Sequence, residues 1–176
     1  LMVHSAQSLA FNHSLSARME AGMSIIEPVE GDLVAPILTN GRIDVGKMAR
    51  VTSTNLERCQ RNCEFGRLAI TGILPGSDSN FASGKPGNFE VQGIDAAGLS
   101  NADWVINEIP RLTTSGTRRA LSVPFSDLSV EQAPDTNDLF NRWEEGPLEG
   151  DRWHPEGASL RLRFTLPAGA YATVLM

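Results

Sequence analysis

The sequence has few cysteines, few histidines and no long apolar run, and each scarcity excludes a class of protein. Its two cysteines, Cys59 and Cys63, lie four positions apart on an expected helix, so they share a face and do not build a disulfide framework. The three histidines are scattered, and no pair is spaced to complete a metal site. No apolar run approaches the ~20 residues that cross a bilayer. These features predict a cytoplasmic protein without metal, cofactor or membrane partner.

Familiar catalytic motifs are missing as well. The chain contains no GxSxG elbow, no HExxH zinc motif, no CxxC pair and no GxGxxG turn. The loop at residues 77–87 carries Lys85 among Ser, Gly and Asn, but its glycine spacing is not that of a P-loop. The residues alone therefore assign no catalytic group.

Basic charge is also in short supply, because the formal net charge is −6. The acidic excess is local: seven carboxylates and two arginines lie between Asp135 and Glu156, and the rest of the chain holds 13 basic and 14 acidic residues. Thirteen of the 15 basic residues are arginine, the side chain that suits bidentate phosphate contacts. The balance argues against a generic nucleic-acid binder, but leaves room for local arginine contacts.

Hydrophobic periodicity indicates alternating helices and strands. We expect helices at residues 5–21, 54–65, 88–97 and 100–110, and strands at 33–38, 42–45, 67–74, 120–125 and from 158 onward. Asn40-Gly41 is typical of a tight hairpin turn, and Thr54 to Glu57 has the form of a capping box. The order predicts an α/β (α+β) domain with a mixed sheet and flanking helices.

Several polar side chains allow two interpretations. Asn12 follows the expected core residue Phe11 and can either cap backbone groups or reach a ligand. Arg118 and Arg119 are adjacent on an expected strand and therefore face opposite sides. One of them can pair with a buried carboxylate while the other reaches solvent or phosphate. A third group, Arg58, Arg61 and Arg67, is expected to form an ordinary solvated surface.

The last stretch, LRLRFTLPAGAYATVLM, has the strongest pattern in the chain. Leu160, Leu162, Phe164 and Leu166 alternate with polar residues, as in a half-buried strand, and Pro167 and Gly169 are expected to end it in a turn. A further apolar run stops at Met176, so we expect the sequence to be part of a longer protein.

This stretch also carries a family resemblance. FTLPAGAYAT resembles the C-terminal signature of the TruD family of tRNA pseudouridine synthases. Three further stretches are similar to that family in the same order: HSAQSLAFNHSLSAR, RLAITGILPGS and GTRRALSVPFSDL. The resemblance spans nearly the whole chain.

The resemblance implies a two-part organisation: an insertion domain at residues 1–157 and the start of the C-terminal catalytic segment at 158–176. Such enzymes use an invariant aspartate on an extruded uridine, within a GxKDxxAxTxQ-like motif that this sequence lacks. The implied partners are tRNA and the missing catalytic half, and the isolated chain is expected to be inactive. The implied RNA-binding or active-site-bordering residues are Asn12, Arg118, Arg119, Leu166, Pro167, Ala168, Gly169 and Tyr171. The alternative is a non-catalytic binding or assembly module that shares the fold.

Overall fold

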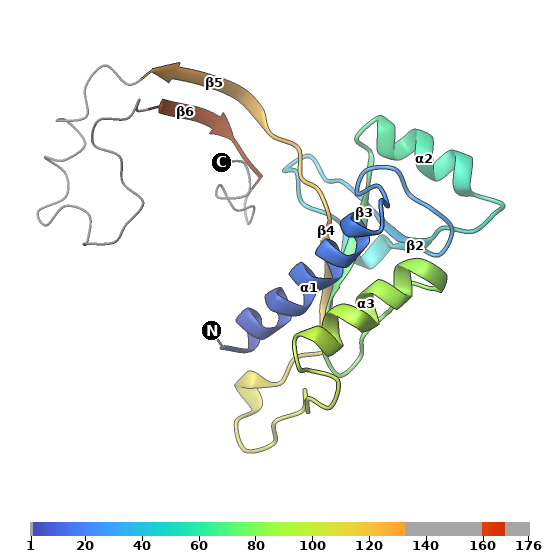
Figure 1. Cartoon of the computed structure of the whole chain (residues 1–176), viewed down its shortest axis with the longest axis vertical. Helices are drawn as coiled ribbons and strands as arrows, with labels where there is room; N and C mark the ends of the chain where they lie inside the picture. Colours follow the sequence, from blue (N-terminus) through green and yellow to red (C-terminus); the bar gives the residue numbers. More distant parts are fainter. Residues whose placement is uncertain (1, 133–159, 168–176) are drawn as a thin grey trace, which may run out of the picture. The chain divides into compact units, whose positions relative to one another are not determined.

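The structure is a computed structural model that describes residues 2–132 and 160–167 (Figure 1). The described residues fall into two compact units. The first unit holds residues 2–124 together with Pro167, and the second holds residues 125–132 and 160–166. The predicted domain boundary at 157/158 lies outside the described residues and stays a prediction.

A four-stranded sheet forms the centre of the first unit. Its order is β2 (Ala49–Arg50), β1 (Leu33–Pro36), β3 (Leu68–Leu74) and β4 (Thr117–Ala120), and each pairing is antiparallel. The predicted α+β class with flanking helices is confirmed. The sequence predicted a mixed sheet, whereas the strand pairs of this sheet are all antiparallel. The connection between β3 and β4 explains the antiparallel pairing of these two strands. The chain leaves the C-terminal end of β3 and comes back to that same end before β4 begins. There the backbone N–H of Ser77 donates to the carbonyl of Thr114 at 3.0 Å.

Three α-helices accompany this sheet: α1 (Met2–Glu20), α2 (Leu56–Glu64) and α3 (Gly84–Ala96). Two short 3-10 turns, η1 (Val45–Lys47) and η2 (Pro110–Leu112), lie in the connections. The predictions of α1, of α2 and of strand β3 are confirmed, and α3 begins four residues earlier than expected. The hairpin at Asn40-Gly41 also forms, with Ile37 bridged to Ile43.

Four local predictions are wrong. The expected strand at 42–45 is reduced to a single bridge at Ile43, because η1 begins at Val45. Residues 100–110 do not form a helix, because the segment folds back on itself: the N–H of Ile106 donates to Thr113 Oγ1 at 2.9 Å. The capping box does not form, since Asn55 is the N-cap of α2 and its side chain instead accepts from the N–H of Thr52 at 2.8 Å. Strand β4 runs from Thr117 to Ala120, whereas a strand at 120–125 was expected. Both arginines therefore lie within the strand and not before it.

Two hydrophobic clusters are attached to strand β3. Ile70 belongs to a cluster with Val34, Val51 and Cys59 of α2. Ile73 belongs to a second cluster with Ala10 of α1 and Ile94 of α3. Ile70 and Ile73 are three residues apart on one strand and so point to opposite faces of the sheet. The core of the first unit is therefore divided by β3.

Helices α1 and α3 lie side by side and approach each other closely (Figure 1). The approach occurs at Gly93, where an added Cβ would lie 2.5 Å from the backbone N of Ser14 and 2.7 Å from the carbonyl oxygen of Ala10. No real Cβ atom tolerates such distances, so only glycine fits there. The contact brings the inner face of α3 over the sheet.

The second unit contains an antiparallel pair of strands. Strand β5 (Ser126–Gln132) pairs with β6 (Leu160–Thr165), and the register shifts between Ser126 and Ser129. The predicted final strand is thus confirmed, beginning at Leu160. Among the described residues, no helix is both long and apolar enough to cross a membrane.

Candidate functional site

A buried arginine–carboxylate pair joins β4 to α3. Both guanidinium Nη atoms of Arg118 donate to the carboxylate of Glu90, and the two side chains are 1% and 6% exposed. Arg118 also donates to the carbonyl of Thr71 at 2.7 Å and, through Nε, to Thr71 Oγ1 at 2.8 Å. The backbone N–H of Ala82 donates to Glu90 Oε2 at 2.8 Å. The sequence prediction that one arginine of the pair meets a buried carboxylate is confirmed, and that arginine is Arg118.

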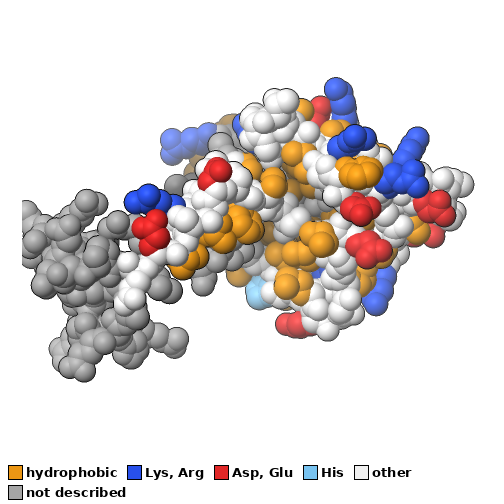
Figure 2. Space-filling view, turned by 90° about the horizontal axis from the view of Figure 1, so that it is seen from above, with side chains coloured by type: hydrophobic (Ala, Val, Ile, Leu, Met, Phe, Trp, Pro, Cys, Tyr) orange, Lys and Arg blue, Asp and Glu red, His pale blue; other side chains and the backbone are white. Residues whose placement is uncertain are grey.

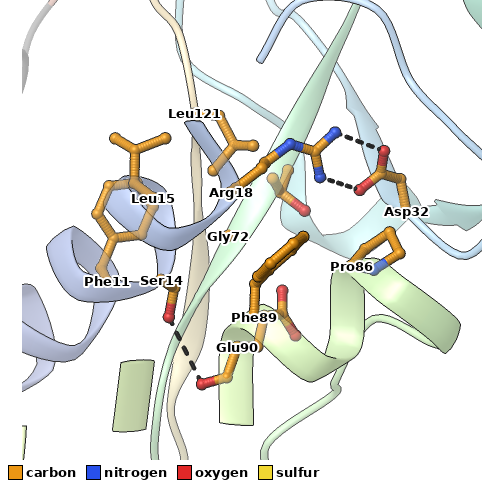
Figure 3. Close-up of a pocket in the computed structure, with 11 residues that line it drawn as sticks. Phe11, Ser14, Leu15, Arg18, Asp32, Gly72, Pro86, Phe89, Glu90 and Leu121 are labelled. Atoms are coloured by element: carbon orange, nitrogen blue, oxygen red, sulfur yellow. Dashed lines mark hydrogen bonds and ion pairs between the residues drawn. The ribbon is translucent and has the colours of Figure 1, made fainter. Parts of the chain in front are cut away.

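A second buried pair joins α1 to the start of β1. Arg18 donates through Nη1 and Nη2 to the two carboxylate oxygens of Asp32, at 2.6 and 2.9 Å (Figure 3). The same carboxylate accepts from the N–H of Val29 at 2.9 Å, and Arg18 Nε donates to the carbonyl of Ser24 at 2.8 Å. Two parallel hydrogen bonds between fixed planar groups define the relative position of helix and strand.

Between these pairs lies a small pocket. Its lining includes Phe11, Arg18, Asp32, Phe89 and Glu90, drawn from α1, α3 and the sheet (Figure 3). Its volume is about 20 Å³, which is about the room that a single water molecule needs. We therefore treat this pocket as a space in the packing between the two buried pairs.

The buried carboxylates are not arranged for catalysis. Asp32 and Glu90 each accept two bonds from an arginine and one from a backbone N–H, so both are held as structural anions. Within residues 2–132 and 160–167, no cluster of His, Cys, Asp and Glu could hold a metal ion. Burial raises the pKa of the thiols of Cys59 and Cys63, which disfavours the reactive thiolate.

The stretches that carry the family resemblance meet in this core. Gln7 of HSAQ donates to the carbonyl of Pro75 in the Leu-Pro-Gly turn at 2.7 Å. Arg119 of the Arg-Arg strand lies over the ring of Phe11, with its guanidinium carbon 5.4 Å from the ring centroid. Three stretches far apart in sequence are thus tied together by side-chain contacts.

The predicted site residues of these stretches have different environments. Asn12 is exposed on α1, one position after Phe11. Arg119 is half-buried above Phe11, on the opposite side of β4 from Arg118. Because the Arg118 guanidinium is enclosed, we assign it to the core. An RNA contact by Asn12 or Arg119 stays a prediction.

The LPAG turn is described only at its beginning. Pro167 packs against the hairpin at Gly41, where φ is +77° and an added Cβ would lie 2.7 Å from Pro167 Cγ. Leu166 is half-buried and belongs to the second unit. The other predicted residues of this turn, Ala168, Gly169 and Tyr171, lie outside the described residues. Their position at an active-site border stays a prediction.

Neither acidic partner of the two buried pairs was predicted from the sequence, and neither was the role of Arg18. Glu90 lies 28 positions before Arg118, on a helix whose inward face reads as small and apolar. Asp32 follows Gly31 and looks like part of a turn. The one available signal was the Arg-Arg dipeptide, which allowed a buried carboxylate as partner for one side chain without identifying it.

Comparison with known proteins agrees with this arrangement of motifs. The model of the TruD family, tRNA pseudouridine synthase D, matches residues 1–176. A relative from Natronomonas pharaonis, described as a probable tRNA pseudouridine synthase D, is 34% identical over 99% of this chain and 34% of its own length. The corresponding Methanosarcina acetivorans protein is 33% identical over 100% of this chain and 36% of its own.

A solved structure shows the same fold. The crystal structure of the Methanosarcina mazei protein assigned to tRNA pseudouridine synthase D superposes with a TM-score of 0.74 at 32% identity. The match covers 97% of this chain and 35% of that one. The α+β fold is therefore shared with part of a protein whose name places it among the tRNA pseudouridine synthases. Within that class the chain belongs to the TruD family, and it spans about a third of the length of the relatives that it matches.

Proposed function

We propose that this chain is part of a TruD-type enzyme that isomerises uridine to pseudouridine in tRNA, and that it contributes RNA binding and positioning. The observation that carries the proposal is the family match over all 176 residues. The relatives are about three times longer than the region matched, which leaves room for a catalytic domain. We assign residues 1–157 to an insertion domain and 158–176 to the start of a catalytic segment, in a cytoplasmic enzyme.

The chain by itself is proposed to be inactive. The sequence has no GxKDxxAxTxQ-like stretch, and Asp32 and Glu90 are committed to arginines. A catalytic aspartate must be free to reach the reacting nucleotide, which neither of these carboxylates is. The remainder of the enzyme would supply that group.

The test is to incubate the purified chain with an unmodified tRNA transcript and to analyse the RNA for pseudouridine, with a full-length TruD relative as positive control. Binding is measured in parallel at two salt concentrations. We expect no pseudouridine and an affinity that falls as salt rises, because phosphate contacts release counterions. Pseudouridine formed by this chain would overturn its proposed inactivity, and absence of binding would overturn the role in RNA positioning.

A second candidate is a non-catalytic binding or assembly module with the same fold. It is favoured by the net charge of −6, which opposes RNA binding. Self-association without tRNA binding would support it. A longer reading frame that carries the aspartate motif would exclude it.

A further inference from the structure

Helix α2 carries a surface that the buried core does not explain. Leu56, Cys59 and Cys63 pack inward against the first hydrophobic cluster. Arg58, Arg61 and Phe65 are spaced by three and four residues, so they share the opposite face. Arg58 and Arg61 are exposed, and the Phe65 side chain is 62% exposed at the helix end. An aromatic ring is thus presented to solvent between arginines.

Arg67 extends this surface beyond the helix. Its guanidinium carbon lies over the Phe65 ring, 5.3 Å from the centroid. We call Arg58, Arg61, Phe65 and Arg67 the α2 surface. Figure 2 shows Lys and Arg side chains projecting from the first unit, with acidic and apolar side chains exposed among them.

The arginines of the α2 surface form no ion pair within the described part of the chain, although Glu57 and Glu64 lie on the same helix. The ion pairs there join Arg18 to Asp32, Lys47 to Asp44 and Arg118 to Glu90. No described carboxylate is within ion-pair distance of Arg58, Arg61 or Arg67. These cations are therefore available to an external anion.

The position of the α2 surface gives it a second connection. The N–H of Ile37 donates to the carbonyl of Arg67 at 2.9 Å, so Arg67 borders the hairpin that ends in Asn40-Gly41. Pro167 packs against Gly41 of the same hairpin. The α2 surface thus borders the hairpin against which Pro167 of the LPAG turn packs.

We propose that the α2 surface binds RNA, with Arg58 and Arg61 contacting backbone phosphates and Phe65 stacking on an unpaired base. This inference rests on the proposed function and specifies where the RNA lies. Arginine suits phosphate geometry, and aromatic rings stack on the splayed bases of RNA loops. Arginine and aromatic residues are also enriched at protein interfaces. Burying three cations against a protein, however, requires matching carboxylates on the partner, whereas RNA supplies an anion at every nucleotide.

The test compares two charge reversals of equal size in tRNA titrations at several salt concentrations. The first is the double variant R58E/R61E, on the α2 surface. The matched control is K85E/R111E, two exposed cations on α3 and η2. The control changes the net charge equally but lies off the α2 surface. Circular dichroism of each variant checks that the fold is retained.

We expect R58E/R61E to weaken binding about 10-fold or more and to make the salt dependence shallower by about one to two phosphate contacts. Phe65→Ala is expected to weaken binding about 5-fold or more, and Phe65→Tyr, which keeps the ring, to restore it. The control K85E/R111E should bind as the parent chain does.

The outcomes separate this inference from the proposed function. If the parent chain binds tRNA and R58E/R61E binds equally well, the α2 surface is excluded while the RNA-positioning role stands. If both double variants weaken tRNA binding equally, binding depends on the overall charge of the chain and not on the α2 surface. That result would also overturn the inference. If the parent chain does not bind tRNA at all, the positioning role itself fails and this inference with it.

Discussion

Helices α2 and α3 both pack onto hydrophobic clusters that include strand β3, yet they handle charge in opposite ways. Helix α3 turns Glu90 inward, where Arg118 of β4 meets it, and packs against α1 through Gly93. Helix α2 turns no charged side chain inward and keeps its arginines in solvent. A buried carboxylate is tolerated on α3 because a fixed cation and a backbone N–H meet both of its oxygens.

The two helices thus distinguish arginines that stabilise the fold from arginines that are exposed to a possible ligand. Arg18 and Arg118 are paired with carboxylates in the core, where they fix the positions of α1, α3 and the strands. Their charges are therefore not available to a ligand. The arginines of α2 contribute nothing visible to packing. Residues of one chemical type therefore divide into two roles, and the partner that each one meets decides which.

The largest expected effect is on the buried pair. Replacing Glu90 by Gln leaves the Arg118 guanidinium buried without a counter-charge, so we expect a loss of about 3–5 kcal/mol in the free energy of unfolding. Urea denaturation measures this directly. The matched change on α2, Glu64→Gln, alters an exposed carboxylate and should stay within about 0.5 kcal/mol.

A double variant sharpens the same point. Glu90→Gln combined with Arg118→Met should lose less than the sum of the two single changes, because the second removes the unpaired charge left by the first. Recovery is expected to be partial, since the carbonyl oxygens of Thr71 and Asn80 lose the donors that Arg118 supplied. Strictly additive losses would mean that the pair does not act as a unit.

An intermediate effect is expected at the α1–α3 contact. Gly93→Ala should destabilise the protein by about 1–3 kcal/mol, because the new Cβ meets the backbone of α1 and the helices must separate. The sign of this change in stability is informative. Helix propensity alone would make Gly93→Ala stabilising, because alanine favours a helix by about 1 kcal/mol over glycine. Gly46→Ala in η1 is the control: its nearest neighbour is the flexible Asp44 carboxylate at 3.3 Å. Equal stability of G93A and the parent chain would contradict the close approach.

Much of this arrangement follows from local sequence patterns, and the rest depends on contacts between distant residues. Helix α1, strand β3 and the Asn40-Gly41 hairpin are predicted from periodicity and turn chemistry within short windows. The apolar residues from Trp104 to Ile109 also suggest a helix, but hydrogen bonds to Thr113 and Thr114 fold that segment into a loop. Local propensity was overridden there by tertiary contacts.

The candidate site shows the same limit. The alternation of a strand requires Arg118 and Arg119 to face opposite sides, and this holds. That Glu90 is the partner of Arg118 depends on how α3 packs, which no local pattern encodes. The exposure of Phe65 is likewise invisible in sequence, where an aromatic at the end of a helix resembles a core residue.

The smallest expected effect tests the apolar side of α2 through its thiols. Burial raises the pKa of Cys63 to about 11, and the nearby Cys59 and Asp32 add to the rise. An unfolded thiol titrates at about 8.5. The folded state therefore favours the protonated thiol, so this contribution to stability is fully present below about pH 8.5 and is lost as the pH rises toward 11. Thermal unfolding midpoints of the parent chain and Cys63→Ala, measured from pH 7 to 11, should converge across that window. Parallel profiles would place the Cys63 thiol in water, and α2 would then lack the dry inner face that turns its arginines outward.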